Sequence, residues 1–382
     1  MATREVPGSY ATITLALAAA ANDDTINIAA GTYEEAITCG TLTGVTIQGA
    51  TEHAEDIIII SSGSSTATVL MNTNCILKNV TVNLSESSGH TAPGYNDLYA
   101  IDGVGGGKVY HVQNVHIYSN RNGVKNQAAG STLDRCIIKF SGPRAVSSAG
   151  GTPGDKRYVT VGTYPSDATC TSCLFVGWPD GGSYDTPDVL INCTYTQAVS
   201  AYNSYGFHAP IIRNCLVHLD SGSVATEYAA GRSGHGYSGN PYPHAGIYAS
   251  STVSASISHG WAAGAGGDYV GSSADSYDTG DVETAGNVEA LYVSLQVPNQ
   301  SSSYDENMRI RSGSLAYRAA VSGASPQPAY DLDGKPFHPT HPSIGCYEYC
   351  FGHKLNGVTV KRTSGSLGIN GTLIKSILGV TT

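Results

Sequence analysis

A short phrase that returns along the chain constrains its fold more than any other feature of the sequence. Each copy contains apolar residues, then Asn or another polar residue, then Val or Cys, and then an alternating stretch. The copies are LTGVTIQG at 42–49, LKNVTVN at 77–83, VQNVHIY at 112–118, LDRCIIK at 133–139, TSCLFV at 171–176, LINCTYT at 190–196 and IRNCLVH at 212–218. Their alignment superposes one position of every copy, namely Val45, Val80, Val115, Cys136, Cys173, Cys193 and Cys215.

The spacing of this position indicates an internal repeat that carries insertions. The steps are 35, 35, 21, 37, 20 and 22 residues, so three are near 21 and three are longer by about 14–16. Period-2 alternation inside each phrase is typical of a strand, and steps near 20 residues leave no room for a crossover helix. Units this short bury their apolar faces by stacking on one another. The sequence therefore predicts an all-β fold, a single right-handed parallel β-helix with one coil per repeat.

Four of the nine cysteines share the repeated position, which predicts a ladder of small buried side chains. Cys170 and Cys173 form a C-x-x-C, but no second pair follows at zinc spacing. We expect residues three apart on a strand to point to opposite faces, which argues against a shared metal ion. Structural thiols are the favoured interpretation over metal ligands or disulfides.

Composition excludes several kinds of partner. The formal net charge is −10, and no basic stripe offers a binding surface for nucleic acid. No apolar run reaches the length that crosses a membrane. The opening MATREVPGSY lacks an apolar signal core, so we expect a protein that does not use the general secretion route.

The first 50 residues resemble a known N-terminal cap. Residues 10–21, YATITLALAAAA, predict one helix, and strand-like phrases follow it. The matching residues are Ala11-Thr12-Ile13, Asp24-Thr25-Ile26, Gly31, Tyr33, Glu35 and Thr46-Ile47-x-Gly49. This pattern resembles the cap of the pectin-lyase-like β-helix superfamily, and the resemblance implies a helix that covers the open end of the first coil.

Residues 287–349 resemble the module that closes many bacterial and phage β-helix proteins. The matches are Ser312, Ser314, Ala316, Gly323, Asp331, Asp333, Gly334, Pro336, Ile344, Gly345, Tyr347 and Glu348, and the departures are Leu315, Phe337, Ser343 and Cys346. Asp331-Leu-Asp-Gly begins like a calcium loop, but the later ligands are missing, so we interpret it as a closing turn. Residues 1–350 are therefore predicted to form one β-helical domain.

The tail, residues 351–382, contains LNGVTV at 355–360, INGTLI at 369–374 and ILGVTT at 377–382. Asn-Gly between strand formers predicts turns. The phrases resemble C-terminal strand repeats of phage structural proteins, which implies a short β tail for assembly or anchoring. A hairpin folded on the last coil is the alternative.

Four stretches predict loops that leave the solenoid on one face, namely 84–104, 141–169, 178–188 and 221–247. They are rich in Gly, Pro, Ser, Tyr and His. The acidic residues available there are Asp97, Asp102, Asp180, Asp185 and Asp188, with Trp178 as a sugar-stacking type of residue. Carboxylates about 5–10 Å apart can serve as acid and base in glycan hydrolysis. Asp in a Gly-rich loop is more often a turn former, however.

The remaining motifs do not indicate a catalytic reaction or a metal site. We expect His111 and His116 to face opposite ways on one strand, and the pairs His338/His341 and His235/His244 lie in a Pro-rich turn and in the longest loop. Gln197-Ala198-Val199 lacks the Arg, Asp and Trp phrases of pectin esterases. We therefore assign no catalytic, cofactor-binding or metal residue.

The leading functional hypothesis is a non-enzymatic virion structural protein of a tailed phage, either a capsid decoration, fibre or spike-type subunit. It implies synthesis in the host cytoplasm, partners among other capsid or tail proteins, and a homo-oligomer, with a trimer as one form. The alternatives are a polysaccharide lyase or hydrolase of tailspike type and a glycan-binding adhesin that contacts the host surface.

Overall fold

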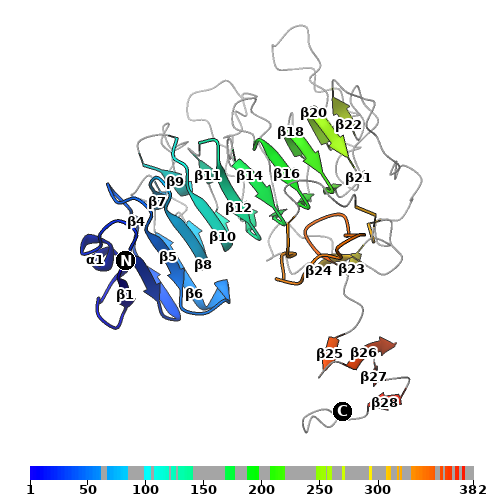
Figure 1. The fold of residues 1–382 in the computed structure, drawn as a ribbon, viewed down its shortest axis with the longest axis horizontal. Coiled ribbons are helices and arrows are strands. Elements are labelled where there is room, and N and C mark those ends of the chain that lie inside the picture. Colours follow the sequence, from blue (N-terminus) through cyan, green and yellow to red (C-terminus); the bar gives the residue numbers. More distant parts are fainter. Residues whose placement is uncertain are drawn as a thin grey trace, which may run out of the picture.

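A computed structural model describes most of the N-terminal two thirds of the chain and shorter pieces beyond it. The described residues are 1–61, 67–84, 99–104, 107–119, 122–125, 128–140, 168–176, 187–197, 207–219, 247–254, 256–259, 269–271, 292–294, 307–310, 316–317, 319–320, 328–348, 353–355, 358–363, 366–369 and 372–374. Figure 1 shows strands stacked along one axis from the N-terminal end, with the α-helix α1 (Ile13–Ala18) beside the first coil.

Each coil contributes up to three strands, and equivalent strands of successive coils pair in parallel to form three rows. Row 1 contains β1 (Thr3–Val6), β2 (Thr25–Ile28), β5 (Thr46–Gly49), the first half of β8 (Ile76–Leu84), the first half of β10 (His111–Ser119), β12 (Ser131–Asp134), β14 (Ala168–Thr171), β16 (Val189–Ile191), and the second halves of β18 (Phe207–Arg213) and β20 (Ile247–Ser254).

Row 2 follows row 1 in each coil, and row 3 follows row 2. Row 2 contains β3 (Gly31–Glu34), β6 (Ile57–Ser61), the second halves of β8 and β10, β13 (Ile137–Phe140), β15 (Leu174–Val176), β17 (Thr194–Gln197), β19 (Leu216–Leu219) and β21 (Ile257–His259). Row 3 contains β4 (Ile37–Thr38), β7 (Ala67–Met71), β9 (Tyr99–Gly103) and β11 (Asn122–Lys125). In later coils the first halves of β18 and β20 pair in parallel with each other, and β20 pairs with β22 (Tyr269–Gly271).

The register confirms the predicted right-handed parallel β-helix. Successive partners in row 1 are Thr25, Thr46, Ile76, His111, Thr132, Thr169, Val189 and Ile211, which gives steps of 21, 30, 35, 21, 37, 20 and 22 residues. Every step advances the chain by one strand spacing whatever its length, because each row 1 strand pairs with its equivalent in the next coil.

The corner between rows 1 and 2 is made by a single residue in the left-handed (αL) conformation. Six successive coils have φ between 50° and 56° at this position, namely at Asn79, Asn114, Arg135, Ser172, Asn192 and Asn214. Asn tolerates this conformation better than most residues, which explains the recurrent Asn of the sequence phrase. One αL residue turns the chain without an insertion, so the following residue points into the core.

The αL corner corrects two predictions about side-chain direction. Cys170 and Cys173 do not point to opposite faces, since Ser172 resets the alternation and both thiols are buried in the core. His111 and His116 do not face opposite ways either: Asn114 lies between them, and both are half-buried on the outside of the solenoid.

The predicted ladder is confirmed for six of its seven positions. Val80, Val115, Cys136, Cys173, Cys193 and Cys215 follow one another through the register of row 2. Val45 was wrongly aligned. Thr46 pairs with Thr25 and Ile76, so Val45 lies between Asp24 and Cys75 at the corner that precedes row 1. The phrase at 42–49 resembles the others in letters, but it is the entry to row 1 and not the corner after it.

Within the part of the chain that the structure describes, the stacked thiols have a structural role. Cys136, Cys173, Cys193 and Cys215 are buried and free, and each Sγ lies 3.1–3.6 Å from main-chain carbonyl oxygens of its own and the preceding coil. Burial raises the pKa of Cys136, Cys173 and Cys193 well above the ordinary thiol value, so these groups stay protonated and poorly nucleophilic.

The contacts made by the N-terminal cap account for several residues of the sequence phrase at the start of the chain. The helix is shorter than the predicted 10–21, because Thr12 is its N-cap and accepts a hydrogen bond from Leu15 N at 3.1 Å. Glu35 accepts hydrogen bonds from Ile13 N and Thr14 N, both at 2.9 Å, so its carboxylate satisfies the first turn of the helix. Gly49 has no space for a side chain, since a Cβ there would lie 2.1 Å from the Asn79 carbonyl oxygen.

Asp24 ties the first strand and the helix to the solenoid. Its carboxylate accepts hydrogen bonds from Ala2 N at 2.6 Å and Ala21 N at 3.0 Å, and it pairs with Arg4 at 2.9 Å. The backbone donors of Ala21 and Ala2, helped by Arg4, lower the pKa of Asp24 to about 2.

Beyond the stack, β23 (Tyr292–Ser294) and β24 (Asn307–Ile310) form an antiparallel pair. The tail forms the antiparallel sheet β25 (His353–Leu355), β26 (Val358–Thr363), β27 (Ser366–Ile369) and β28 (Thr372–Ile374). Asn356-Gly357 and Asn370-Gly371 fall between paired strands, where the sequence predicts turns, whereas 377–382 lies outside the described residues. The domain boundary at 350 and the assembly role of the tail stay predictions.

We predict that Asp24 makes the fold acid-sensitive. Its pKa is lower in the folded chain than the ordinary 3.8, so its contribution to stability is present above about pH 4 and is lost as the pH falls toward 2. Thermal unfolding of the protein and of Asp24→Asn should therefore differ most between pH 5 and 7, and the difference should shrink as the pH falls toward about 2. A difference that stays constant over this range would contradict this role.

Candidate functional site

Several long segments of the chain begin at one edge of the described solenoid, the end of row 2. The segments 85–98, 141–167, 177–186, 198–206 and 220–246 each begin where a described row 2 strand ends, after β8, β13, β15, β17 and β19 respectively. The coils stack in register, so these starting points follow one another along the axis. We call this line the insertion edge. The loop predicted over 84–104 is wrong at its C-terminal end, because Tyr99–Gly103 form strand β9. Most of the other predicted loop residues lie outside the described ones, so a shared face for the loops stays a prediction.

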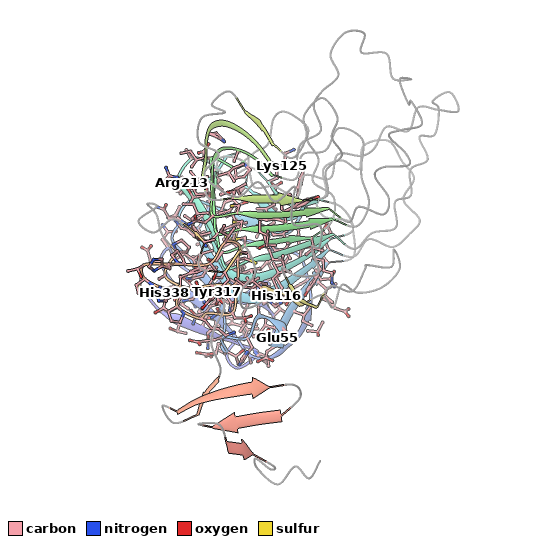
Figure 2. The ribbon with its side chains drawn as sticks, turned by 90° about the vertical axis from the view of Figure 1, so that its right-hand side faces the viewer. Glu55, His116, Lys125, Arg213, Tyr317 and His338 are labelled. Atoms are coloured by element: carbon pink, nitrogen blue, oxygen red, sulfur yellow. The ribbon has the colours of Figure 1, made fainter. Side chains whose placement is uncertain are left out.

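Row 3 is the described surface that lies across the insertion edge from row 2, and it carries a carboxylate and an ammonium group on adjacent coils. Asp102 of β9 is the one carboxylate in the described row 3 strands, and Lys125 of β11 is its partner in the parallel register. Figure 2 shows Lys125 on a different side of the solenoid from His116 and Tyr317. Paired positions on adjacent coils hold their side chains about one strand spacing apart.

Two tyrosines complete this group, which we call the row 3 cluster: Tyr99, Asp102, Tyr110 and Lys125. Lys125 Nζ lies 4.8 Å from the ring centroid of Tyr99, a cation–π distance. The buried Tyr110 donates from its hydroxyl to the Lys125 carbonyl oxygen at 2.8 Å. Burial, with the charge of Asp102, raises the pKa of Tyr110 well above its ordinary value.

Asp102 itself is only 9% exposed, and its Oδ1 accepts a hydrogen bond from Gly103 N at 2.7 Å. A carboxylate, an ammonium group and an aromatic ring in one place can bind a polar ligand with a flat apolar face, which is the chemistry of sugar recognition. Acid–base cleavage needs a second carboxylate about 5–10 Å away, and the described row 3 strands do not supply one.

The structure does not pair Asp102 with Asp188. Asp188 precedes β16, four coils after the coil that contains Asp102, which corresponds to roughly 19 Å at the usual strand spacing. Asp97, Trp178, Asp180 and Asp185 lie outside the described residues, as do His235 and His244. Lys125 was missed because its strand lacks the repeated phrase. The available signal was the pair of inward apolar residues Ile101 and Val124, which occupy one register position on adjacent coils.

The C-terminal Asp331-Leu-Asp-Gly segment is a tight turn. Asp331 accepts hydrogen bonds from Lys335 N at 2.6 Å and Glu348 N at 2.9 Å, and Gly334 adopts φ 75°. Asp333 pairs with Lys335 at 3.0 Å. Burial outweighs these donors and raises the pKa of Asp331 to about 6. Both carboxylates have protein partners, as a structural turn requires.

The neighbouring histidines, His338 and His341, also take part in the hydrogen bonds of this turn. His338 Nδ1 accepts hydrogen bonds from His341 N at 3.1 Å and Thr340 N at 3.4 Å. The neutral ring therefore carries its proton on Nε2, which leaves no lone pair there for a metal ion. Within the described part of the chain, no three His, Cys, Asp or Glu side chains gather into a metal-binding group. Nor does any helix in that part have the length and apolarity that a membrane crossing requires.

Comparison with known proteins concerns the fold. No family model and no curated protein matches the sequence. Among solved structures, the chain is similar to the pectin methylesterase from Aspergillus niger, at 17% identity and a TM-score of 0.34, over 56% of this chain and 83% of that one. It is also similar to pectate lyase Pel9A, at 12% identity and a TM-score of 0.40, over 91% of this chain and 96% of that one.

The class of protein is that of the right-handed parallel β-helices, which the strand register establishes independently of these similarities. The two solved structures are a pectin methylesterase and a pectate lyase by name. The phage-type tail and the virion role predicted from the sequence have no counterpart in these comparisons and stay predictions.

Proposed function

We propose that the protein is a β-helical scaffold that binds an extended surface polysaccharide along the insertion edge and the adjoining face of row 3. One observation carries the proposal: insertions begin at the same edge in successive coils, beside a row that holds Asp102 and Lys125 on neighbouring strands. A linear array of recognition segments suits a linear polymer better than a compact ligand.

The chemistry of the row 3 cluster favours a sugar polymer of low charge. Lys125 offers a donor and Asp102 an acceptor for hydroxyl groups, beside the ring of Tyr99, which is itself buried against Lys125. The net charge of −10 would repel a dense polyanion, and Lys125 is a single positive group beside a carboxylate. A neutral or sparsely charged bacterial surface polysaccharide is therefore the proposed ligand.

We further propose that the protein belongs to a phage particle as a spike or fibre-type subunit that uses this contact to hold the host surface. The observation in favour is the tail, whose described strands β25–β28 form an antiparallel sheet made from the phage-like phrases. The outer strands of such a sheet can pair with another chain. The role is binding without turnover; a depolymerase that uses Asp102 as acid or base is the competing proposal.

The binding proposal predicts a residue-specific loss of affinity. The protein is screened on an array of oligosaccharides from bacterial surface polysaccharides, and the best ligand is titrated by calorimetry. Lys125→Met should weaken binding by about tenfold or more, a loss of about 1.4 kcal/mol, because it removes the ammonium group and its contact with Tyr99.

Lys78→Met is the matched control. Lys78 is half-buried on the outer face of row 1, away from the insertion edge, so its loss should leave the affinity unchanged. No reducing ends should be released by the wild-type protein. Equal losses in both variants, or binding to no oligosaccharide, would reject the row 3 site. Reducing ends that disappear in Asp102→Asn would favour the depolymerase.

The virion proposal predicts a copy number. Quantitative mass spectrometry of purified phage particles should find this chain at a few copies per particle, the stoichiometry of a spike or fibre. A number in the range of the major capsid protein would instead indicate a capsid decoration. Absence from the particles would refute the virion role while leaving the glycan-binding proposal intact.

A further inference from the structure

We infer that the C-terminal segment 328–348, together with Ile310, Ala316 and Ala320, is a latch that opens and closes as one unit with the coils of β14–β19. We call these residues the side module. Figure 1 shows its ribbon beside the later coils of the stack. The inference concerns the stability of these coils and does not depend on the proposed function.

The apolar half of the contact lies on the outer face of row 2. Alternation along β15 and β19 directs Phe175 and Val217 into the core and Leu174, Val176 and Leu216 outward. These outward side chains are nevertheless 7%, 6% and 1% exposed. Their partners in one apolar cluster are Ile310, Ala316, Ala320, Leu332, Ile344, Cys346 and Tyr347 of the side module. Without the module, a row of large apolar side chains would face water.

The polar half of the contact uses the αL corner. Asn192 donates from Nδ2 to the Ser343 carbonyl oxygen at 2.9 Å, and Ser172 donates from Oγ to the Tyr330 carbonyl oxygen at 2.8 Å. On the following coil, the Asn214 carbonyl oxygen accepts a hydrogen bond from Gly345 N at 2.8 Å. The residues that turn three successive coils therefore also hold the module.

Row 2 adds a further bond, from Cys346 N to Thr194 Oγ1 at 3.0 Å, and Thr194 is buried like the three corner residues. Removing one partner of a buried hydrogen bond leaves the other unsatisfied, which costs more than the bond itself contributes. Departure of the module would exchange these hydrogen bonds for bonds to water and would expose the apolar row. The module and the coils are thus stable only together, which makes them one cooperative unit.

The earlier coils obtain their corner contact locally. Asn114 donates from Nδ2 to the Glu52 carbonyl oxygen at 2.7 Å, across 62 residues, within the loop that contains η1 (Ala54–Asp56). Asn192 reaches its partner Ser343 across 151 residues. The solenoid is therefore divided: its N-terminal coils are complete without the C-terminal third of the chain, and the coils of β14–β19 are not.

Gly345 offers a way to disturb the contact. A Cβ at this position would lie 2.8 Å from Thr194 Oγ1 and 3.3 Å from Leu216 Cβ, and its φ is 96°. Gly130 is a matched control, since its φ is 97° but the nearest atom to an added Cβ is Val109 Cγ1 at 3.9 Å. Gly345→Ala and Gly130→Ala thus share the backbone strain, and only the first pushes the module away from the coils.

The buried cysteines report opening at known places in the full-length protein. Cys346 lies in the module, Cys173, Cys193 and Cys215 lie in the dependent coils, and Cys39 and Cys75 lie in the N-terminal coils. Pulsed alkylation with iodoacetamide followed by mass spectrometry gives a rate for each thiol. In Gly345→Ala, Cys346, Cys173, Cys193 and Cys215 should react together, about tenfold faster than in the wild type, while Cys39 and Cys75 keep their rates.

Gly130→Ala should leave the four latch thiols at wild-type rates. The inference is overturned if Cys346 alone reacts faster, since the module would then detach from coils that stay folded without it. It is equally overturned if both variants give the same pattern.

Asn192→Gly with the control Asn114→Gly serves if Gly345→Ala does not fold. Glycine keeps the αL corner, so Asn192→Gly removes the side-chain bonds to the module together with the bond that Asn192 Oδ1 accepts from Asn214 Nδ2. The control Asn114→Gly removes an equivalent bond between coils, from Asn114 Nδ2 to Asn79 Oδ1. The same four thiols should then accelerate in Asn192→Gly and not in Asn114→Gly. Acceleration in neither variant, or to the same extent in both, would refute the latch.

Discussion

The fold depends on one αL residue at the corner between rows 1 and 2. A single residue with φ near 50° turns the chain and resets the alternation, so that apolar side chains before and after the corner both enter the core. Asn79, Asn114, Asn192 and Asn214 adopt this conformation at low cost. The αL conformation is less favourable for Arg135 and Ser172, and Ser172 donates a hydrogen bond to the side module.

This tight corner has a consequence for the rest of the coil. From β8 to β19, rows 1 and 2 are joined by one αL residue, so the longer steps of these coils have their additional residues after row 2. In the preceding coil, residues 50–56 with η1 separate β5 from β6. The solenoid consequently has distinct sides. Row 1 presents a polar column in which Gln48 donates to Asn27 at 3.1 Å and Thr171 donates to Asp134 at 2.8 Å. Row 2 is covered in its later coils by the side module, and row 3 adjoins the insertion edge.

Much of this architecture is predictable from the sequence because it is periodic. The spacing of the repeated phrase indicates stacked coils, and the cysteine ladder follows from its alignment. The phrase also shows where prediction fails. Period-2 alternation assumes an uninterrupted strand. The predicted side-chain directions of Cys170 and His116 are therefore wrong, because an αL residue interrupts the alternation in each case. The alignment of Val45 is wrong because the sequence just before row 1 resembles the sequence of the corner after row 1.

The candidate site was less predictable for a different physical reason. Asp102 is visible as an acidic residue in a predicted loop, but its neighbour Lys125 is fixed by the pairing of β9 with β11, two strands without the phrase. The docking of the side module on row 2 is likewise a contact between distant segments, with Asn192 and Ser343 separated by 151 residues, and no local pattern encodes such a contact.

The most direct test of the account is a set of distances along the solenoid axis. Spin labels at Asn27 paired with labels at Asp134, Thr171 or Arg213 occupy one outward column of row 1, separated by four, five and seven coils. Double electron–electron resonance should then give backbone separations of roughly 19, 24 and 34 Å, an equal increment for every coil. In particular, the 37-residue step from Asp134 to Thr171 should add no more than one strand spacing. Distances that grow with the number of intervening residues would contradict the stacked register on which the fold, the insertion edge and the latch all depend.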